Sequence, residues 1–263
     1  MSLVSIERAG AVATLWLDRA EKRNALDATL MRDLAAALDE IRDDTTARVL
    51  LLRGRGPLFS SGIDHTLLLE VFQKSRSAPF PHLHGDLQAV FDRLDRMHRP
   101  VVAVLHRLCM GMALELALAC DLRIATADCV LGLPEVAFGI LPDVGGTTRL
   151  TRVVGPARAR ELILTGKAIR AATAERWGLV NEVATDDADL TRRLERLTRR
   201  LVAHSPIALG HAKQLIAASA EVDAATSLRL EGIFQEVLLA QPDVATRFPQ
   251  AVAFIKQEMN DPD

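Results

Sequence analysis

Residues 109–146 read CMGMALELALACDLRIATADCVLGLPEVAFGILPDVGG, a largely apolar stretch that contains two glutamates, Glu115 and Glu135. Burying a carboxylate in apolar surroundings is costly unless another group pairs with it or a reaction uses it. Gly111 lies four residues before Glu115, and the pattern predicts a helix from Gly111 through Ala119. Packing by itself requires neither acid, so this stretch indicates a reaction centre.

The surroundings of the two glutamates predict different protonation behaviour. Pro134 and two flanking glycines leave Glu135 weakly solvated, which should raise its pKa and let it exchange a proton near neutral pH. Glu115 falls near the start of a helix, where backbone amides favour an anion, so we expect it to be the more ionised of the two. Each glutamate has a structural alternative: Glu135 bound to backbone amides at a strand end, and Glu115 as a partner of the helix dipole.

Hydrophobic periodicity on both sides of this stretch predicts alternating strands and helices. An Asp27-capped helix runs to about Ile41, and a helical pattern covers 86–97. Residues 64–81 lack regular periodicity and indicate a variable surface segment. Short strands are expected at 12–17, 49–52, 101–105, 122–125 and 130–133. After Gly145 and Gly146 a further helix begins, and from about Asp187 the chain reads as helical only, with helices at 190–204, from 205, 223–240 and 244–259.

Composition and charge exclude several classes of protein. The 263 residues are 49% hydrophobic and 25% charged, with a formal net charge of −2, so no basic field is available for nucleic acid or anionic lipid. The sequence shows no cleavable signal and no apolar run long enough to span a bilayer. Three cysteines without CxxC spacing predict buried, reduced thiols in a cytoplasmic protein. His65, His82 and His84 lack the acidic or cysteine companions of a metal site, so we expect no metal.

Four motifs in this order resemble the crotonase superfamily of enoyl-CoA hydratases and isomerases: KRNAL at 22–26, FSSGID at 59–64, GMALELALACD at 111–121 and LGLPEVAFGILPDVGGTTRL at 131–150. The absence of a GxGxxG or Walker loop also favours this family over a doubly wound nucleotide-binding sheet. The resemblance implies an α/β fold: a spiral of repeated ββα units over 1–200, then a C-terminal helical trimerisation region over 201–263. It also implies a homo-trimer or a hexamer formed from two trimers.

Residue by residue, the resemblance implies a site built around the two glutamates. Glu115 would orient and activate a water, and Glu135 would share that water and act as the acid at Cα. The backbone amides of Ile63 and Met112 would form an oxyanion hole for the thioester oxygen. Residues at the matching substrate-binding positions are Arg23, Ser61, Gly62, Asp64, Gly111 and Asp143. Arg23 is expected near the CoA phosphates and has a solvated loop charge as its alternative, and both glycine turns could be simple tight connections.

Asp143 leaves two alternatives open, and two other positions depart from the family pattern. Asp143 could be a second proton relay along the acyl chain, as in dienoyl-CoA isomerases, or the N-cap of the following helix. Met112 stands where hydratases commonly have glycine, and Ile63 where they commonly have alanine. We therefore expect both side chains to crowd the acyl pocket while their amides stay usable.

These observations predict an enoyl-CoA hydratase that adds water to a trans-2-enoyl-CoA in acyl-CoA catabolism. No metal or organic cofactor is expected, because coenzyme A is part of the substrate. The first alternative is an enoyl-CoA or dienoyl-CoA double-bond isomerase that uses Glu135 and Asp143. The second is a non-catalytic CoA-binding or assembly protein with the same fold, since a fold does not determine a function.

Overall fold

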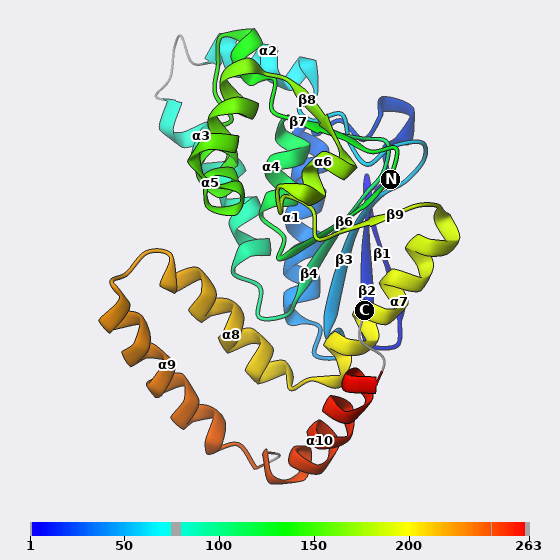
Figure 1. Cartoon of the computed structure of the whole chain (residues 1–263). Helices are drawn as coiled ribbons and strands as arrows, with labels where there is room; N and C mark the ends of the chain where they lie inside the picture. The colour runs from blue at the N-terminus through cyan, green and yellow to red at the C-terminus, as the bar shows by residue number, and fades with distance from the viewer. Residues whose placement is uncertain (1, 75–79, 243, 261–263) are drawn as a thin grey trace. The chain divides into compact units, whose positions relative to one another are not determined.

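The computed structural model describes residues 2–74, 80–242 and 244–260 (Figure 1). The chain divides into two compact units, Met1–Pro206 and Ile207–Asp263. The division that we predicted between residues 200 and 201 falls inside helix α7 (Asp187–Ala203), which belongs to the first unit.

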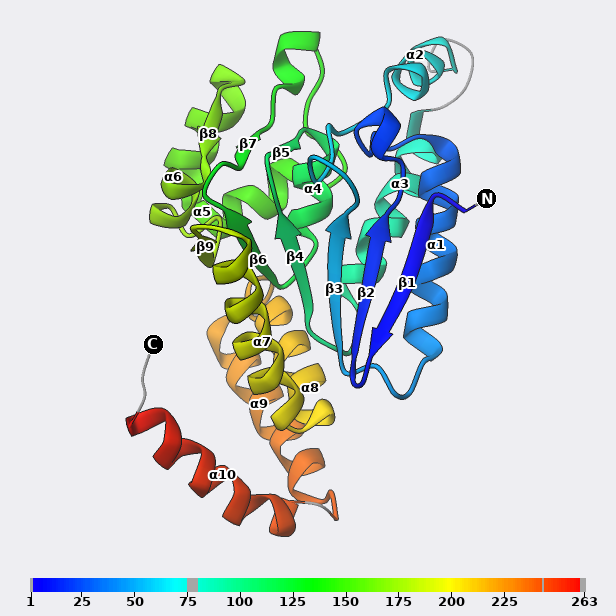
Figure 2. The same cartoon turned by 90° about the vertical axis from the view of Figure 1, so that its right-hand side faces the viewer.

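A six-stranded sheet forms the centre of the first unit, with the strand order β1-β2-β3-β4-β6-β9 (Figure 2). β1 pairs with β2 in an antiparallel hairpin, and each later neighbour pairs in parallel. Parallel neighbours need crossover connections, and helices provide them. The strands are β1 (Val4–Ala9), β2 (Val12–Leu17), β3 (Val49–Gly54), β4 (Val101–Leu105), β6 (Leu122–Thr126) and β9 (Glu182–Ala184).

A second, three-stranded sheet contains β5 (Leu108–Met110), β7 (Val130–Gly132) and β8 (Ala168–Arg170) in the order β5-β7-β8. The chain alternates between the two sheets: β4 of the large sheet leads to β5 of the small one and then to a helix, and β6, β7 and a helix repeat the pattern. This alternation is the spiral of ββα units that the sequence predicted.

Helices cover both faces of the large sheet. α1 (Ala28–Asp43) begins at Asp27, whose side chain accepts a hydrogen bond from the Leu30 amide as predicted, and it buries its apolar face in the larger core. α7 covers the opposite face through Leu190 and Leu194, in a second cluster that includes Val102 of β4. The other described helical elements of this unit are η1 (Ala20–Lys22), α2 (His65–Lys74), α3 (Phe80–Asp95), α4 (Met112–Leu118), η2 (Glu135–Phe138), α5 (Gly146–Thr165) and α6 (Ala171–Arg176).

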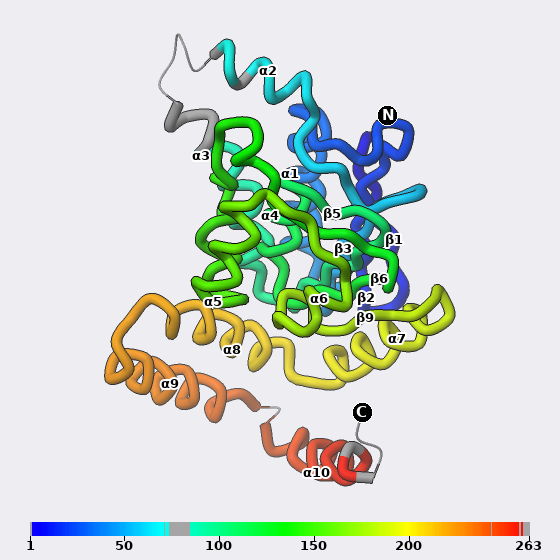
Figure 3. The backbone as a smooth tube through the Cα atoms, turned by 45° about the horizontal axis from the view of Figure 1, so that its top comes forward, coloured from blue at the N-terminus to red at the C-terminus, as the bar shows by residue number. Residues whose placement is uncertain are grey.

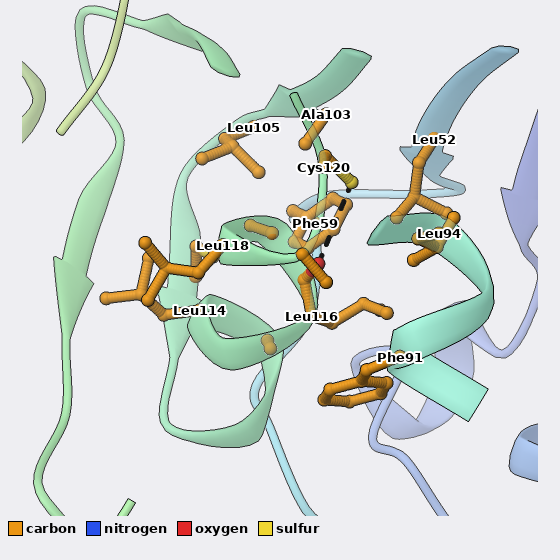
Figure 4. Close-up of a cluster of buried hydrophobic side chains, with 14 of the residues drawn as sticks. Leu52, Phe59, Phe91, Leu94, Ala103, Leu105, Leu114, Leu116, Leu118 and Cys120 are labelled. Carbon is orange, nitrogen blue, oxygen red and sulfur yellow. Dashed lines mark hydrogen bonds between the residues drawn. The ribbon is translucent and has the colours of Figure 1, made fainter. Parts of the chain in front are cut away.

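Helix α4 (Met112–Leu118) lies at the centre of the first unit, next to β5 and α5 (Figure 3). All seven of its residues are buried. Leu114, Leu116 and Leu118 contribute to an apolar cluster that also contains Phe91 of α3 (Figure 4). A helix buried on every side is held rigidly by close packing, so α4 is a firm support for the one charged side chain that it carries, Glu115.

The segment 64–81, predicted to lack regular structure, differs from the prediction where it is described: His65–Lys74 form helix α2, and residues 75–79 lie outside the described residues. Asp64 accepts a hydrogen bond from the Thr66 amide at 2.9 Å, which starts the helix, and Leu67 is buried. Leu69 and Phe72 are exposed apolar residues, and they obscure the polar face by which a surface helix is normally recognised. The predicted helix at 86–97 is present and begins earlier, at Phe80.

The second unit consists of helices, as the sequence predicted. α8 (Pro206–Ser219) precedes α9 (Ala224–Leu239), and α10 (Val244–Asn260) follows. Asp223 caps α9 by accepting a hydrogen bond from the Thr226 amide. Over the whole described part of the chain, none of the helices combines the length and the apolar character needed to cross a membrane.

Candidate active site

Glu115 is held by the segment that starts helix α5. Its side chain belongs to a residue that is only 2% exposed, and its Oε1 accepts hydrogen bonds from the amides of Val144 at 2.9 Å and Gly146 at 2.8 Å. A Cβ on Gly146 would lie 2.7 Å from that oxygen, so only glycine lets the backbone come this close. Glu115 is therefore fixed in direction by main-chain groups far from it in sequence.

Glu135 is the second buried carboxylate, at the first position of η2. It is 9% exposed, and its Oε2 is buried without a hydrogen-bond partner among the described residues. Its Oε1 lies against Gly111, because a Cβ built there would be 2.9 Å away. A buried carboxylate oxygen without a partner is costly. Glu135 therefore presents an acceptor at the start of α4 that a substrate or a water can use.

The two glutamates titrate near neutral pH because they are buried together. Burial raises the pKa of Glu115 to about 8, helped by the charges of Glu135 and Asp143 and opposed by the Gly146 and Val144 amides. Burial raises the pKa of Glu135 to about 7, and the charge of Asp143 adds to the effect. Two interacting carboxyls with neighbouring pKa values hold about one proton between them near neutral pH.

One prediction about this pair is wrong. Glu115 was expected to be the more ionised glutamate, yet its pKa is raised further than that of Glu135. The favourable amides do exist, but they come from the start of α5 and not from the first turn of α4, and the deeper burial of Glu115 outweighs them. The place of a residue within a predicted helix does not show how deeply the folded protein buries that helix.

The amides of Ile63 and Met112 come from two segments that touch. Gly62 has a φ of +92°, and a Cβ there would lie 2.4 Å from the Met110 carbonyl oxygen and 3.5 Å from the Met112 nitrogen. Neither the Ile63 amide nor the Met112 amide donates a hydrogen bond to any residue in the described ranges. The Met112 amide also belongs to the first turn of α4, and Gly111 before it has a φ of +56°. Two neighbouring amides without acceptors are able to donate together to one negatively charged oxygen.

Two buried polar residues that the sequence analysis did not single out hold the Gly62 turn. Asn24 is fully buried, and its side-chain amide donates to the carbonyl oxygens of Arg55, Leu58 and Phe59. The Ser60 hydroxyl donates to the Asn24 carbonyl at 2.7 Å and accepts from the Gly62 amide at 3.1 Å. Both lie inside the motifs KRNAL and FSSG, so the motifs contained the signal, but their polar side chains gave no sign of being buried.

The predicted substrate-binding residues divide into two groups. The Arg23 carbonyl accepts from the Ser61 amide at 3.0 Å, which places KRNAL beside FSSG, and the Arg23 side chain is exposed. Asp64 is different: it is 6% exposed, its Oδ2 is paired with Arg19 at 2.7 Å, and this pairing lowers its pKa to about 2. Asp64 Oδ1 accepts a hydrogen bond from the Thr66 amide, so both oxygens of the carboxylate are bound by protein groups. We therefore assign Asp64 a positioning role.

Asp143 does not cap helix α5, because the N-cap residue is Gly145. Asp143 is half-buried, and its charge acts on both glutamates, so it belongs to the same site. Met112 is 3% exposed and belongs to the larger core, and its expected crowding of the acyl pocket stays a prediction. Ile63 is half-buried and packs against the edge of that core.

The three cysteines were expected to be buried, reduced thiols, and three histidines were expected to bind no metal. Cys109, Cys120 and Cys129 are buried and free, which confirms the predicted thiols, and burial raises the pKa of Cys129 to about 12. A thiol with such a pKa is a poor nucleophile. His65 is exposed, and the side chains of His82 and His84 lie outside the described residues.

Two buried carboxyls with raised pKa values, near two backbone amides without acceptors, form an arrangement that is able to move protons beside an oxygen on which negative charge develops. The family model for enoyl-CoA hydratase/isomerase matches residues 7–248. The chain belongs to the enoyl-CoA hydratase/isomerase family, the crotonase superfamily, and the ββα spiral of the first unit is the fold of that family.

Three individual proteins show the extent of the similarity. The chain is 35% identical over 243 residues to the 2,3-dehydroadipyl-CoA hydratase of Escherichia coli K12, with 92% of each chain covered. The crystal structure of an enoyl-CoA hydratase from Thermoplasma volcanium GSS1 matches with a TM-score of 0.86 at 30% identity, covering 95% of this chain and 97% of that one. A protein of Thermobifida fusca YX, solved in complex with acetoacetyl-CoA, matches with a TM-score of 0.82 at 31% identity, covering 91% and 95%.

Proposed function

We propose that this enzyme is an enoyl-CoA hydratase that adds water syn across the double bond of a trans-2-enoyl-CoA, in the catabolism of fatty acids or related acyl-CoA compounds. The observation that carries the proposal is the unpartnered, buried Oε2 of Glu135 beside a second glutamate that is held rigidly by two amides. A water bound between these carboxyls would receive its orientation from Glu115, whose direction is fixed.

The amides of Ile63 and Met112 would bind the thioester oxygen and stabilise the enolate that forms when oxygen attacks Cβ. One carboxylate takes a proton from the attacking water, and the other carboxyl delivers a proton to Cα. Because the pair holds about one proton before and after the addition, the cycle closes without a further proton donor. We assign water activation to Glu115 and proton delivery at Cα to Glu135, whose free oxygen suits a group that contacts substrate. The higher pKa of Glu115 places the shared proton on Glu115 in the free enzyme, so these roles require the proton to lie on Glu135 once substrate and water are bound.

The substrate is an acyl-CoA thioester, and coenzyme A enters as part of it, so the proposed reaction uses no separate cofactor and no metal. Arg23, with its exposed side chain beside the Gly62 turn, would approach the CoA phosphates, and Ser61 would contact the nearby part of the CoA chain. Buried free cysteines are compatible with a reducing compartment, and we propose a cytoplasmic location.

Incubation with crotonyl-CoA tests the proposal. We expect the absorbance of the conjugated thioester to fall as 3-hydroxybutyryl-CoA forms, with a narrow bell-shaped pH profile whose limbs lie near the pKa values of the pair, about 7 and about 8. Loss of the shared proton explains the alkaline limb, and gain of a second proton explains the acidic limb. An unchanged absorbance at every pH, with crotonyl-CoA bound, would reject the hydratase assignment.

Asp143 gives the isomerase alternative a specific basis, because its charge acts on both glutamates and it could serve a more distant carbon of the acyl chain. A 3-enoyl-CoA substrate separates the two reactions. Conversion to the conjugated 2-enoyl-CoA without later hydration, lost in Asp143→Asn, would assign the enzyme as an isomerase.

We also propose that the second unit makes the protein a homo-trimer. The trimer would exist either alone or as one half of a hexamer. None of the residues of α9 is buried, and large apolar side chains on it are exposed, among them Leu228, Ile233 and Val237. A helix that has no buried residue and carries several exposed large apolar side chains is normally covered by a partner. We expect sedimentation to give three or six times the 28.7 kDa chain mass, and Ile233→Asp with Val237→Asp to reduce it. A monomeric wild-type protein would contradict the proposal.

A further inference from the structure

The peptide unit that joins Asp143 to Val144 is held at both ends. Its N–H, on Val144, donates to Glu115 Oε1 at 2.9 Å, and its carbonyl oxygen, on Asp143, accepts from the Gln88 side-chain amide at 3.0 Å. In a trans peptide the N–H and the C=O point in opposite directions on one rigid plane. A bond that fixes the carbonyl on one side therefore also fixes the direction of the N–H on the other.

The carbonyl of the next peptide is held as well. The guanidinium of Arg149 donates to the Val144 carbonyl at 3.2 Å and is paired with Asp92 at 2.8 Å and Asp95 at 3.3 Å. Gln88, Asp92 and Asp95 follow the i, i+4, i+7 spacing of a single helix face. One face of α3 thus holds the loop above Glu115 by two independent connections, and Gln88 is the connection to the peptide that binds the carboxylate.

We propose that Gln88 is a positioning residue of the active site, which holds the 143–144 peptide so that the Val144 amide faces Glu115. The inference deepens the proposed hydratase function and rests on it for the reaction that Glu115 serves. Without the Gln88 donor, this peptide can rotate, and its carbonyl rather than its N–H can turn toward the carboxylate. The carbonyl oxygen of this peptide would then face the carboxylate oxygen of Glu115, and both are acceptors. Their repulsion would displace the Glu115 side chain and make it harder to ionise.

The charged groups that act on Glu115 define how this would be measured. Glu135 of η2 and Asp143 of the loop both raise its pKa, and the Val144 and Gly146 amides lower it. Removing the contribution of one amide should therefore move the titration of Glu115 upward by about 0.5 to 1 pH unit. A general loosening of the fold that lets water reach Glu115 would move the titration downward, toward the usual value of a glutamate.

The test compares Gln88→Met, which keeps the length of the side chain and removes the donor, with Gln88→Glu, which replaces the donor by an acceptor. We expect the apparent pKa of Glu115, followed by carboxyl ¹³C NMR without substrate and assigned with Glu115→Gln, to rise in both. The alkaline limb of kcat should shift with it, and kcat at pH 7 should fall about tenfold with KM within a factor of about two. Gln241→Met, which removes a glutamine bond to the Val237 carbonyl in the second unit, is the matched control.

A Glu115 titration that stays at the wild-type value in Gln88→Met overturns the proposal, whether or not kcat falls, and so does a downward shift. The NMR titration does not depend on turnover, so it separates the two proposals. If wild-type protein hydrates no enoyl-CoA while the Gln88 variants still shift the titration, the hydratase function fails and the positioning role of Gln88 stands.

Discussion

Glu115→Gln and Glu135→Gln are each expected to lower kcat for crotonyl-CoA hydration by about 10³-fold, the range typical of a lost general acid or base. Glutamine keeps the shape and, at position 115, an oxygen that can still accept from the Val144 and Gly146 amides. The loss therefore reports on proton transfer and not on a collapsed site. Steady-state kinetics with crotonyl-CoA measures it, with KM expected to change by much less than kcat.

Glu195→Gln is the matched control, because Glu195 is an exposed glutamate on α7, and its kinetics should equal those of the wild type. If both active-site variants retained wild-type turnover, the carboxyls would have no role in the reaction and the proposed mechanism would be rejected. If Glu115→Gln lost hydration but kept double-bond isomerisation, the water-activating role of Glu115 would be supported and a dual activity established.

Glu115→Gln is also expected to stabilise the protein at alkaline pH. Folding raises the pKa of Glu115 from its usual 4.5 to about 8, so the folded state binds the proton more tightly than the unfolded state. The resulting stabilisation is complete below about pH 4.5 and is lost as the pH rises to about 8. Glu115→Gln has no charge to bury, so above pH 8 its free energy of unfolding should exceed that of the wild type by roughly a few kcal/mol. Near pH 4 the two free energies of unfolding should be equal. Urea unfolding at several pH values measures the difference.

Gly62→Ala is expected to lower kcat by about 10²- to 10³-fold, the usual cost of losing an oxyanion-hole donor. The added Cβ would stand 2.4 Å from the Met110 carbonyl oxygen, and the φ of +92° disfavours any side chain. The backbone must move there, and the movement separates the Ile63 amide from the Met112 amide. Crotonyl-CoA kinetics and the affinity for acetoacetyl-CoA, whose enolate resembles the intermediate, should fall together.

Gly178→Ala is the matched control for backbone strain. Gly178 also has a positive φ, +75°, but a Cβ there would meet open space and no other atom. This substitution should cost stability through the same backbone strain and leave kcat unchanged. Equal kinetic losses in the two variants would show that general destabilisation, and not the oxyanion hole, accounts for the effect of Gly62→Ala.

Most of the fold could be predicted from hydrophobic periodicity and from the residues that begin and end helices and strands. The Asp27 cap, the strands at 101–105 and 122–125 and the three C-terminal helices are present as expected. The prediction failed at α2, where exposed apolar side chains hide the helical pattern, and for strands of three residues such as β5 and β8, which are too short to carry a period. These two short strands belong to the second sheet, so the pairing in that sheet came from the structure, whereas the ββα spiral was implied by the family resemblance.

The site was predictable to a lesser degree. Its two glutamates stood out because charge in an apolar run is unusual, and the glycines before Ile63 and Met112 marked the close approaches. The amides that hold Glu115 come from residues 144 and 146, and no local signal joins them to residue 115. The buried scaffold of Asn24 and Ser60 and the ion pair that occupies Asp64 were likewise invisible in the sequence.

The amino-acid sequence by itself determined the family, the order of helices and the presence of two acids in a segment that packs inside. These properties depend on residue type and on spacing along the chain. Only the tertiary structure decided which acid titrates higher, which acid is bound to an arginine and which amides lack an acceptor. Each of these depends on depth of burial and on partners contributed by distant segments, and the solvation of a charge is set by everything that surrounds it in space.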